Sequence, residues 1–89
     1  MAAKYRLVIE ARAAKQLNKL DPFQQRFILS WLRKNVDGTD DPRAKGKGLS
    51  ENLAGLWRYR IGDYRVICDI RDDMCEIIAV EVGHRSSIY

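Results

Sequence analysis

The chain has 89 residues, of which 46% are hydrophobic and 31% are charged, and it carries a net charge of +4. This length and composition exclude two independent domains and a largely disordered chain, so we expect residues 1–89 to form a single domain. No apolar run approaches the roughly 20 residues that cross a bilayer, and the first residues lack the apolar stretch of a secretion signal, which favours a cytoplasmic protein without a membrane partner.

A strand and a helix are predicted at the start of the chain. Residues 5–10 include β-branched residues and partly alternate between polar and apolar, which is typical of a short strand. Apolar residues including Ala13 and Leu17 then recur at helical spacing, and the basic residues between them point away from that stripe. We therefore expect a helix over residues 11–19.

The second helix has the clearest signals in the chain. Asp21 can cap its N-terminus, Pro22 suits its first turn, and Gln24 occupies the third position of a capping box. The helix is predicted to end before Gly38, a residue suited to a C-terminal cap. Its predicted apolar stripe consists of Phe27, Ile28, Trp31, Leu32 and Val36. The two helices together would form a helical hairpin.

Residues 38–55 hold four glycines and one proline without a sustained period, which predicts a long loop. Three strands are then predicted over residues 56–61, 64–71 and 75–82. In order, these elements give an α+β fold with an N-terminal strand, a helical hairpin and a three-stranded antiparallel meander. The loop carries basic residues that could contact a strand of nucleic acid or simply be solvated, namely Arg43, Lys45 and Lys47.

A tight turn at Gly62-Asp63 fixes the register of the first predicted hairpin. Glycine in the first position suits a two-residue type II′ turn, so Arg60 should lie opposite Arg65. Alternation then separates two faces. The apolar face would carry Trp57, Tyr59, Ile61, Tyr64, Val66, Cys68 and Ile70, and the other face would carry Arg58, Arg60 and Arg65.

Three arginines on one sheet face are difficult to explain by folding alone, because like charges opposite one another destabilise a sheet. Guanidinium groups bind phosphate oxygens bidentately and stay charged at any working pH, which points to a phosphate-binding surface and to RNA. The alternative is that these arginines are solvated or paired with acidic residues, namely Asp63, Asp69 or Glu76.

The residues after the last predicted strand add an arginine, an imidazole and a phenol, namely Arg85, His84 and Tyr89. Gly83 is a natural place for a β-bulge that re-aims the residues after it. Two cysteines, Cys68 and Cys75, lie in predicted strands and are expected to be reduced core thiols. With one histidine in the chain, they do not form the ligand set of a metal site.

Together these segments resemble the RelE/ParE superfamily of toxins from type II toxin-antitoxin systems. The resemblance runs from Tyr5 to Tyr89 and depends on the order and spacing of several short pieces. These pieces are Tyr5-Arg6, residues 14–20 (AKQLNKL), Asp41-Pro42-Arg43, residues 55–67 (GLWRYRIGDYRVI) and Gly83-His84-Arg85.

The resemblance implies a βααβββ ribonuclease fold of the RelE type that needs no metal or other cofactor. It also implies cleavage of mRNA in the A site of the 30S ribosomal subunit, by attack of a ribose 2′-hydroxyl on the adjacent phosphate, and so inhibition of translation. The partner would be an acidic RelB-like antitoxin in a hetero-oligomer. The residues that match the family's catalytic set are Arg58, Arg60, Arg65, Arg85 and Tyr89. His84 is added to the catalytic candidates as a residue type suited to proton transfer, and the basic loop residues Arg43, Lys45 and Lys47 are the expected substrate-binding residues.

The implied roles differ between these residues. Arg65 and Arg85 would stabilise the charged transition state or assist the leaving group, and Tyr89 would stack on or orient a base. Several RelE members have lysines where this chain has Arg58 and Arg60, and an arginine is essentially never deprotonated in a protein. The general base is therefore left between His84 and Tyr89.

Two other functions fit the same sequence. A ParE-like toxin would share the fold and inhibit DNA gyrase without being an enzyme. ParE-like members generally lack the full set of arginines and the terminal tyrosine, so the set found here favours RNA cleavage. A basic interaction module with no toxic activity is the third possibility, and unchanged growth on expression without a partner would favour it.

Overall fold

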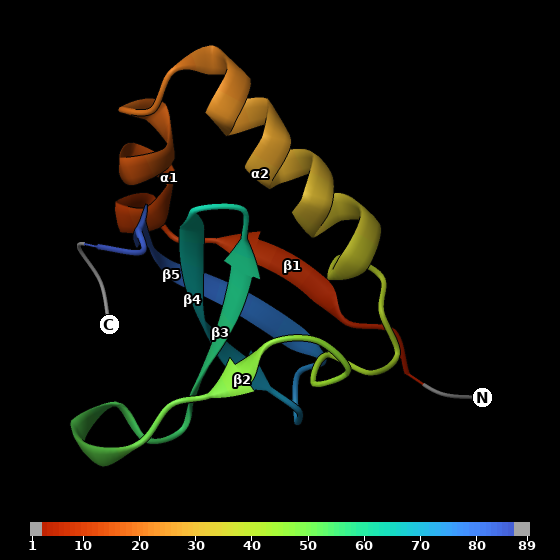
Figure 1. Cartoon of the computed structure of the whole chain (residues 1–89). Coiled ribbons are helices and arrows are strands. Elements are labelled where there is room, and N and C mark those ends of the chain that lie inside the picture. The colour runs from red at the N-terminus through yellow and green to blue at the C-terminus, as the bar shows by residue number, and fades with distance from the viewer. Residues whose placement is uncertain (1–2, 87–89) are drawn as a thin grey trace.

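The computed structural model describes residues 3–86 and consists of two helices that cover one face of a β-sheet (Figure 1). The elements in chain order are β1 (Arg6–Ile9), α1 (Ala11–Asn18), α2 (Pro22–Asn35), β2 (Lys47–Gly48), the 3-10 helix η1 (Glu51–Leu53), β3 (Leu56–Ile61), β4 (Tyr64–Arg71) and β5 (Glu76–His84). The predicted α+β class and order of the main elements are confirmed. In the part of the chain that is described, neither helix is both long and apolar enough to cross a bilayer.

The start of α2 follows from its sequence. Asp21 is the N-cap residue, and its side chain accepts a hydrogen bond from the backbone N–H of Gln24 at 3.1 Å. Pro22 occupies the first helical position, where its missing N–H costs nothing. Arg33 and Lys34 lie in the last turn, where positive charge stabilises the helix dipole. The predicted boundaries of α2 are therefore confirmed.

The sheet has five strands in the order β1-β5-β4-β3-β2. The three long strands form the predicted antiparallel meander, and β1 pairs in parallel with the first half of β5. The remaining strand, β2, has two residues and pairs antiparallel with β3 at the edge of the sheet. The prediction of a loop without structure over residues 38–55 was therefore wrong at β2 and at η1. Neither segment is long enough to show a sequence period.

The core lies between the helices and the helix-facing side of the sheet. Ile28 and Leu32 of α2 are buried there, as predicted, and so is Val36, the residue that follows the helix. Phe27 was assigned to the same stripe, but 45% of its surface is exposed. Its ring stacks on Phe23, with ring centroids 6.4 Å apart, and lies against the β3–β4 turn, 3.1 Å from where a Cβ on Gly62 would be. The stripe is therefore narrower than its apolar residues suggested.

The two cysteines are free thiols, as predicted, but only one lies in the core. Cys68 is buried in β4, and burial raises the pKa of its thiol to about 12, so it stays protonated. Cys75 is half-buried in the turn before β5, with a positive φ of 52°. Its prediction as a strand and core residue was wrong, because the turn from Asp72 extends through it.

Candidate functional site

The hairpin of β3 and β4 has the predicted register. Arg60 pairs with Arg65, and Arg58 pairs with Ile67. Gly62 has a φ of 59°, and Asp63 is not among the residues with positive φ, as expected of a type II′ turn. A glycine is required at the first position of such a turn because an L side chain rarely adopts that conformation.

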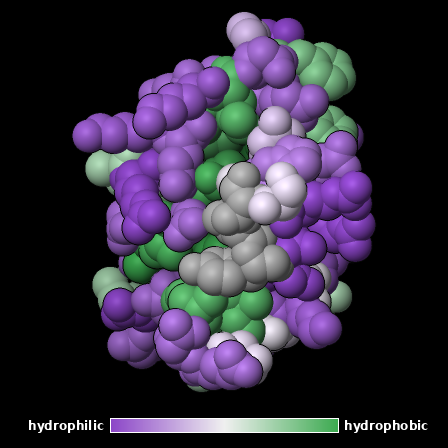
Figure 2. Space-filling view, turned by 60° about the vertical axis from the view of Figure 1, so that its left-hand side comes forward, coloured by the Kyte–Doolittle hydropathy of each residue, from purple (hydrophilic) through white to green (hydrophobic). Residues whose placement is uncertain are grey.

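Alternation places three arginines on the sheet face that the helices leave uncovered. Tyr59 and Val66, which alternate with them along β3 and β4, are buried in the core against the helices. Arg58, Arg60 and Arg65 therefore lie on the opposite face, which we call the arginine face. Figure 2 shows hydrophilic residues over most of one side of the molecule, with a band of hydrophobic residues between them.

The cations of the arginine face act on one another. Desolvation is the main reason that the pKa of Arg65 is lowered, and the positive charges of Arg58, Arg60 and Arg85 lower it further. Within residues 3–86, no acidic side chain forms an ion pair with Arg58 or Arg60. The alternative that these two are neutralised by Asp63, Asp69 or Glu76 is therefore wrong for the described residues. An anion at this face would relieve the repulsion.

An apolar residue forms part of the floor of the arginine face. Ile67 lies opposite Arg58 on this side of the sheet, yet only 2% of its surface is exposed. Ion pairs beside a buried apolar group are screened less by water than ion pairs in open solvent. Ile67 was not predicted as part of the site, although its place two residues after Arg65 was a sufficient signal.

Arg85 extends the arginine face beyond the end of β5. Its backbone N–H donates to the carbonyl oxygen of Asp63 at 2.8 Å, which holds it beside the hairpin turn. Gly83 pairs with Arg65, so Arg85, two residues later, returns to the same face. The side-chain ion pair of Arg85 with Asp63 is long, at 3.9 Å, and both groups are largely exposed. Such a pair contributes little and leaves the guanidinium accessible.

His84 is not brought to the arginine face. It pairs with Tyr64, one position away from the pair of Gly83 with Arg65, so alternation points it toward the helix-covered side. The ring of Tyr64 meets it edge to face, with centroids 5.4 Å apart. Its Nδ1 lies 2.8 Å from the hydroxyl of Ser86. Tyr89, the other candidate base, lies outside the described residues.

The β-bulge in β5 lies earlier along the strand than predicted. Ile67 pairs with Glu81 and Cys68 pairs with Ala79, so Val80 is the extra residue. The bulge was expected at Gly83, which instead pairs regularly with Arg65. A bulge shifts every following residue to the other face, so its position decides that Gly83 and Arg85, and not His84, lie on the side of Arg65.

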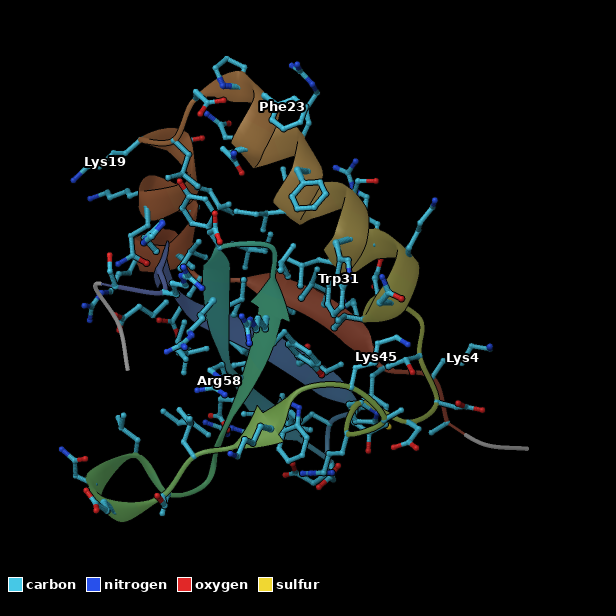
Figure 3. The ribbon with its side chains drawn as sticks, in the orientation of Figure 1. Lys4, Lys19, Phe23, Trp31, Lys45 and Arg58 are labelled. Atoms are coloured by element: carbon cyan, nitrogen blue, oxygen red, sulfur yellow. The ribbon has the colours of Figure 1, made fainter. Side chains whose placement is uncertain are left out.

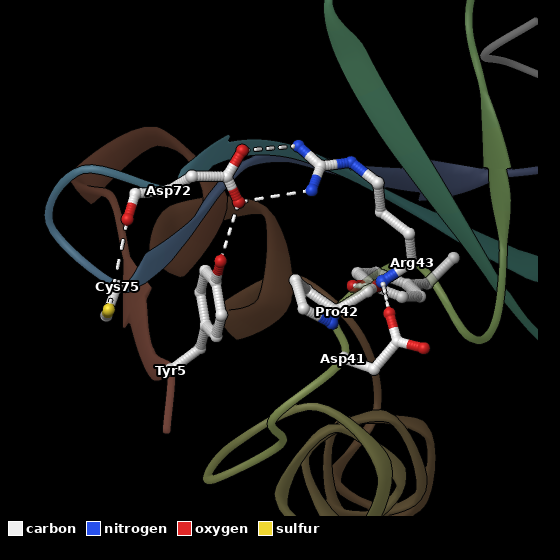
Figure 4. Close-up of polar contacts among 7 residues, drawn as sticks. Tyr5, Asp41, Pro42, Arg43, Asp72 and Cys75 are labelled. Carbon is white, nitrogen blue, oxygen red and sulfur yellow. Dashed lines mark hydrogen bonds and ion pairs between the residues drawn. The ribbon is translucent and has the colours of Figure 1, made fainter. Parts of the chain in front are cut away.

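Arg43 is engaged in a structural contact. Its guanidinium donates two hydrogen bonds to the carboxylate of Asp72, at 3.1 and 3.0 Å (Figure 4). Tyr5 Oη donates to the same carboxylate at 2.6 Å. The bidentate pair with Arg43 is the main reason that the pKa of Asp72 is lowered, and the bond from Tyr5 lowers it further. The contact ties residues 38–55 to the turn between β4 and β5.

The two lysines of the same segment lie in different places. Lys47 in β2 pairs with Arg58, so it borders the arginine face. The carbonyl oxygen of Lys45 accepts a hydrogen bond from Trp57 Nε1 at 2.7 Å, and its side chain lies on the other side of β3 from Arg58 (Figure 3). Of the three predicted substrate-binding residues in this segment, the structure brings only Lys47 to the arginines.

Gly46 explains why β2 can pair with β3. A Cβ at this position would lie 2.4 Å from the carbonyl oxygen of Arg58 and 2.5 Å from Trp57 Nε1. Its φ of 87° is also one that L side chains rarely adopt. Only glycine therefore lets the segment approach closely enough to place Lys47 beside Arg58. The glycines were read from the sequence as signs of a loop, and this second meaning was missed.

Comparison with known proteins identifies the family. The sequence model of the ParE toxin of type II toxin-antitoxin system, parDE, matches residues 7–89. The chain belongs to this family. The predicted membership of the RelE/ParE superfamily is thereby confirmed, and the protein is a toxin of a type II toxin-antitoxin system.

The toxin is also similar to proteins named for the RelE branch. It is 28% identical to Toxin RelG of Mycobacterium tuberculosis over 96% of its own length and 95% of the relative's. It is 29% identical to Toxin RelE of the same organism, over 96% and 86%. A chain of the toxin-antitoxin complex RelBE2 from Mycobacterium tuberculosis superposes with a TM-score of 0.84 and 26% identity, covering 93% of the toxin and 100% of that chain.

Proposed function

We propose that the toxin is a ribosome-dependent endoribonuclease that cleaves mRNA in the A site and so inhibits translation in the cytoplasm. The observation that carries the proposal is the arginine face, where the side chains of Arg58, Arg60 and Arg65 share one uncovered surface with Arg85. The similarity of the toxin's sequence to proteins named RelE and RelG supports assignment to the RelE branch of the superfamily. A cluster of four guanidinium groups is better suited to bind the uniformly negative backbone of RNA than to bind a protein surface of mixed charge.

The arginines would act by positioning and by charge. Attack of a 2′-hydroxyl on the adjacent phosphate builds negative charge on the phosphorane oxygens and on the departing 5′-oxygen. In the proposed roles, Arg65 and Arg85 stabilise that charge, while Arg58, Arg60 and Lys47 hold the flanking phosphates in line. The reaction as proposed requires no metal ion or other cofactor.

Proton transfer needs a different kind of group. Arginine stays protonated, so none of the four arginines can take the proton of the 2′-hydroxyl. His84 and Tyr89 remain the candidates for proton transfer, and Tyr89 also for stacking on a base. If His84 acts, the end of β5 must reorient on the ribosome, because its ring lies on the side of Tyr64 in the isolated chain.

The proposed partners follow from the charge of the same face. The structure is similar to chains from a toxin-antitoxin complex of Mycobacterium tuberculosis and from an archaeal RelE–RelB complex of Pyrococcus horikoshii, the latter with a TM-score of 0.70 and 26% identity. We propose that an acidic RelB-like antitoxin forms a hetero-oligomer with the toxin and neutralises the arginine face. The ribosome and mRNA would be its targets when the antitoxin is absent.

Addition of the purified toxin to translating ribosomes, followed by mapping of mRNA 5′ ends, tests the proposal. Cuts within the codon in the A site are expected, and none on the same mRNA without ribosomes. An Arg65→Ala/Arg85→Ala variant should produce no cuts and should be non-toxic. The absence of A-site cuts, together with undiminished toxicity of that variant, would contradict the proposal.

A second candidate function is inhibition of DNA gyrase, because the family model that matches the chain is that of the ParE toxin. A supercoiling assay with purified gyrase separates the two functions. The ribonuclease proposal predicts full supercoiling at toxin concentrations that abolish translation. Loss of supercoiling with intact mRNA would favour the ParE-like function instead.

A further inference from the structure

The second half of β5 has an edge that no strand among residues 3–86 covers. β1 pairs with β5 only from Glu76 to Ala79, and the last ladder contact is the N–H of Glu10 donating to the carbonyl oxygen of Ala79 at 3.0 Å. Beyond that point α1 runs beside β5 (Figure 1). The edge of β5 must therefore find hydrogen-bond partners on a helix, since a partly buried N–H without a partner is costly.

Gln16 of α1 supplies one such partner. Its Oε1 accepts a hydrogen bond from the backbone N–H of Val82 at 2.6 Å, in a partly buried position. One helical turn earlier, Arg12 pairs with Glu81 at 3.6 Å. Residues four apart lie on the same side of a helix, so α1 holds two consecutive residues of β5 with one face.

Val82 is a core residue that is adjacent in sequence to residues on the arginine face. Its side chain is buried in the core, and the residue before it, Glu81, is the first to pair with β4 after the bulge at Val80. The residue after it, Gly83, pairs with Arg65. Arg85 then donates its backbone N–H to Asp63. The backbone position of Val82 therefore determines where Arg85 lies relative to Arg65.

We propose that Gln16 is a positioning residue for the arginine face: through Val82 it fixes the end of β5 and so aligns Arg85 with Arg65. The inference rests on the proposed function for its catalytic consequence, but its geometric part concerns the backbone alone. Gln16 is proposed to act through Val82 alone, without contact with RNA or with the arginines. Its substitution should lower the rate of cleavage and leave the affinity for ribosomes unchanged.

Two substitutions of Gln16 and one control test the inference. Gln16→Met keeps the length of the side chain and removes the acceptor, and Gln16→Glu restores an acceptor oxygen. Gln25→Met is the matched control, because Gln25 donates its side-chain bond to the carbonyl oxygen of Leu20 at 2.7 Å, away from β5. Amide hydrogen exchange by NMR and the kcat and KM of ribosomal cleavage are measured for each variant.

In Gln16→Met we expect the amides of Val82 and Arg85 to exchange roughly tenfold faster and kcat to fall about tenfold with KM unchanged. Gln16→Glu should restore both, and Gln25→Met should change neither. Unchanged exchange at Arg85 in Gln16→Met would overturn the inference, as would an equal change in Gln25→Met or a full kcat despite faster exchange. If the unsubstituted toxin does not cleave, the proposed function fails, while the exchange at Arg85 still decides whether Gln16 fixes the strand end.

Discussion

The two ends of the uncovered sheet face differ in whether their arginines form ion pairs with carboxylates. At the end near the β4–β5 turn, arginines are matched with carboxylates: Arg6 with Glu76, and Arg71 with Asp69 at 2.7 Å. At the end near the β3–β4 turn, no carboxylate within residues 3–86 forms an ion pair with Arg58 or Arg60. Both ends belong to one sheet.

This difference separates arginines that serve the fold from arginines available to a ligand. A paired surface arginine gains little stability and offers no net charge to an anion. Neighbouring arginines repel one another, and the charges of Arg58, Arg60 and Arg85 add to the desolvation that lowers the pKa of Arg65. A surface on which cations repel one another is expected to bind an anion. The number of arginines alone would not distinguish the two ends of the sheet.

The largest effect is expected from removing charge at the arginine face. We predict that Arg65→Ala/Arg85→Ala lowers the rate of mRNA cleavage roughly 1000-fold, because two donors to the developing charge are lost. The matched control is Arg6→Ala/Arg71→Ala, which removes the same number of arginines from the paired end and should keep the rate within about twofold. Equal losses in the two variants would remove the distinction between the ends.

A smaller effect is expected on stability from the contact that ties residues 38–55 to β3. Tyr59 Oη donates to the carbonyl oxygen of Pro42 at 2.5 Å, and both residues are buried. Tyr59→Phe leaves that carbonyl without its partner, so the free energy of unfolding should fall by about 1–2 kcal/mol in urea denaturation. Tyr64→Phe, in the neighbouring strand, is the control. A fall of the same size in the control would argue against the contact.

Lys47 should contribute modestly to RNA binding. Its place beside Arg58 predicts that Lys47→Ala weakens binding of a short single-stranded RNA about threefold and reduces the slope of log affinity against log salt by about 0.7. Lys45→Ala provides the comparison, because that side chain lies on the other side of β3. Fluorescence anisotropy at several salt concentrations gives both values. An unchanged slope for Lys47→Ala would exclude a phosphate contact.

The smallest effect concerns pH at the paired end. The pKa of Asp72 is held below its ordinary value of 3.8, chiefly by the hydrogen bonds from Arg43. A lowered carboxylate pKa adds stability above the unfolded value, and that stability is lost as the pH falls through the folded value. Asp72→Asn should therefore melt a few degrees below the unsubstituted toxin at pH 7, and the two melting curves should converge below pH 3.8. A difference that persists in acid would contradict this assignment.

The sequence predicted the arginine face because its geometry is local. A two-residue turn with glycine first fixes which residues pair, and alternation then assigns each side chain to a face. The pairing of Arg60 with Arg65 was predicted from Gly62 and Asp63 alone, and the structure confirms it. The N-terminal cap of α2 was predictable for the same reason, since Asp21 and Gln24 are three residues apart.

The features that were missed depend on contacts between distant residues. The bond of Arg43 with Asp72 joins residues 29 positions apart, and no local pattern shows it. The bulge at Val80 decides which face His84 joins, yet one additional residue in a strand leaves no signal in the sequence. Phe27 fits the apolar period of α2, and only the packing on the sheet shows that it lies outside the core.

RNA is expected to bind to the arginine face and not to the end of the sheet where arginines are paired with carboxylates. Titration of the toxin with a short RNA, followed through the Nε–H resonances of its arginines, tests it most directly. The resonances of Arg58, Arg60 and Arg65 are expected to shift together, while those of Arg6, Arg43 and Arg71 stay in place. Shifts confined to the second group, or equal shifts in both groups, would contradict it.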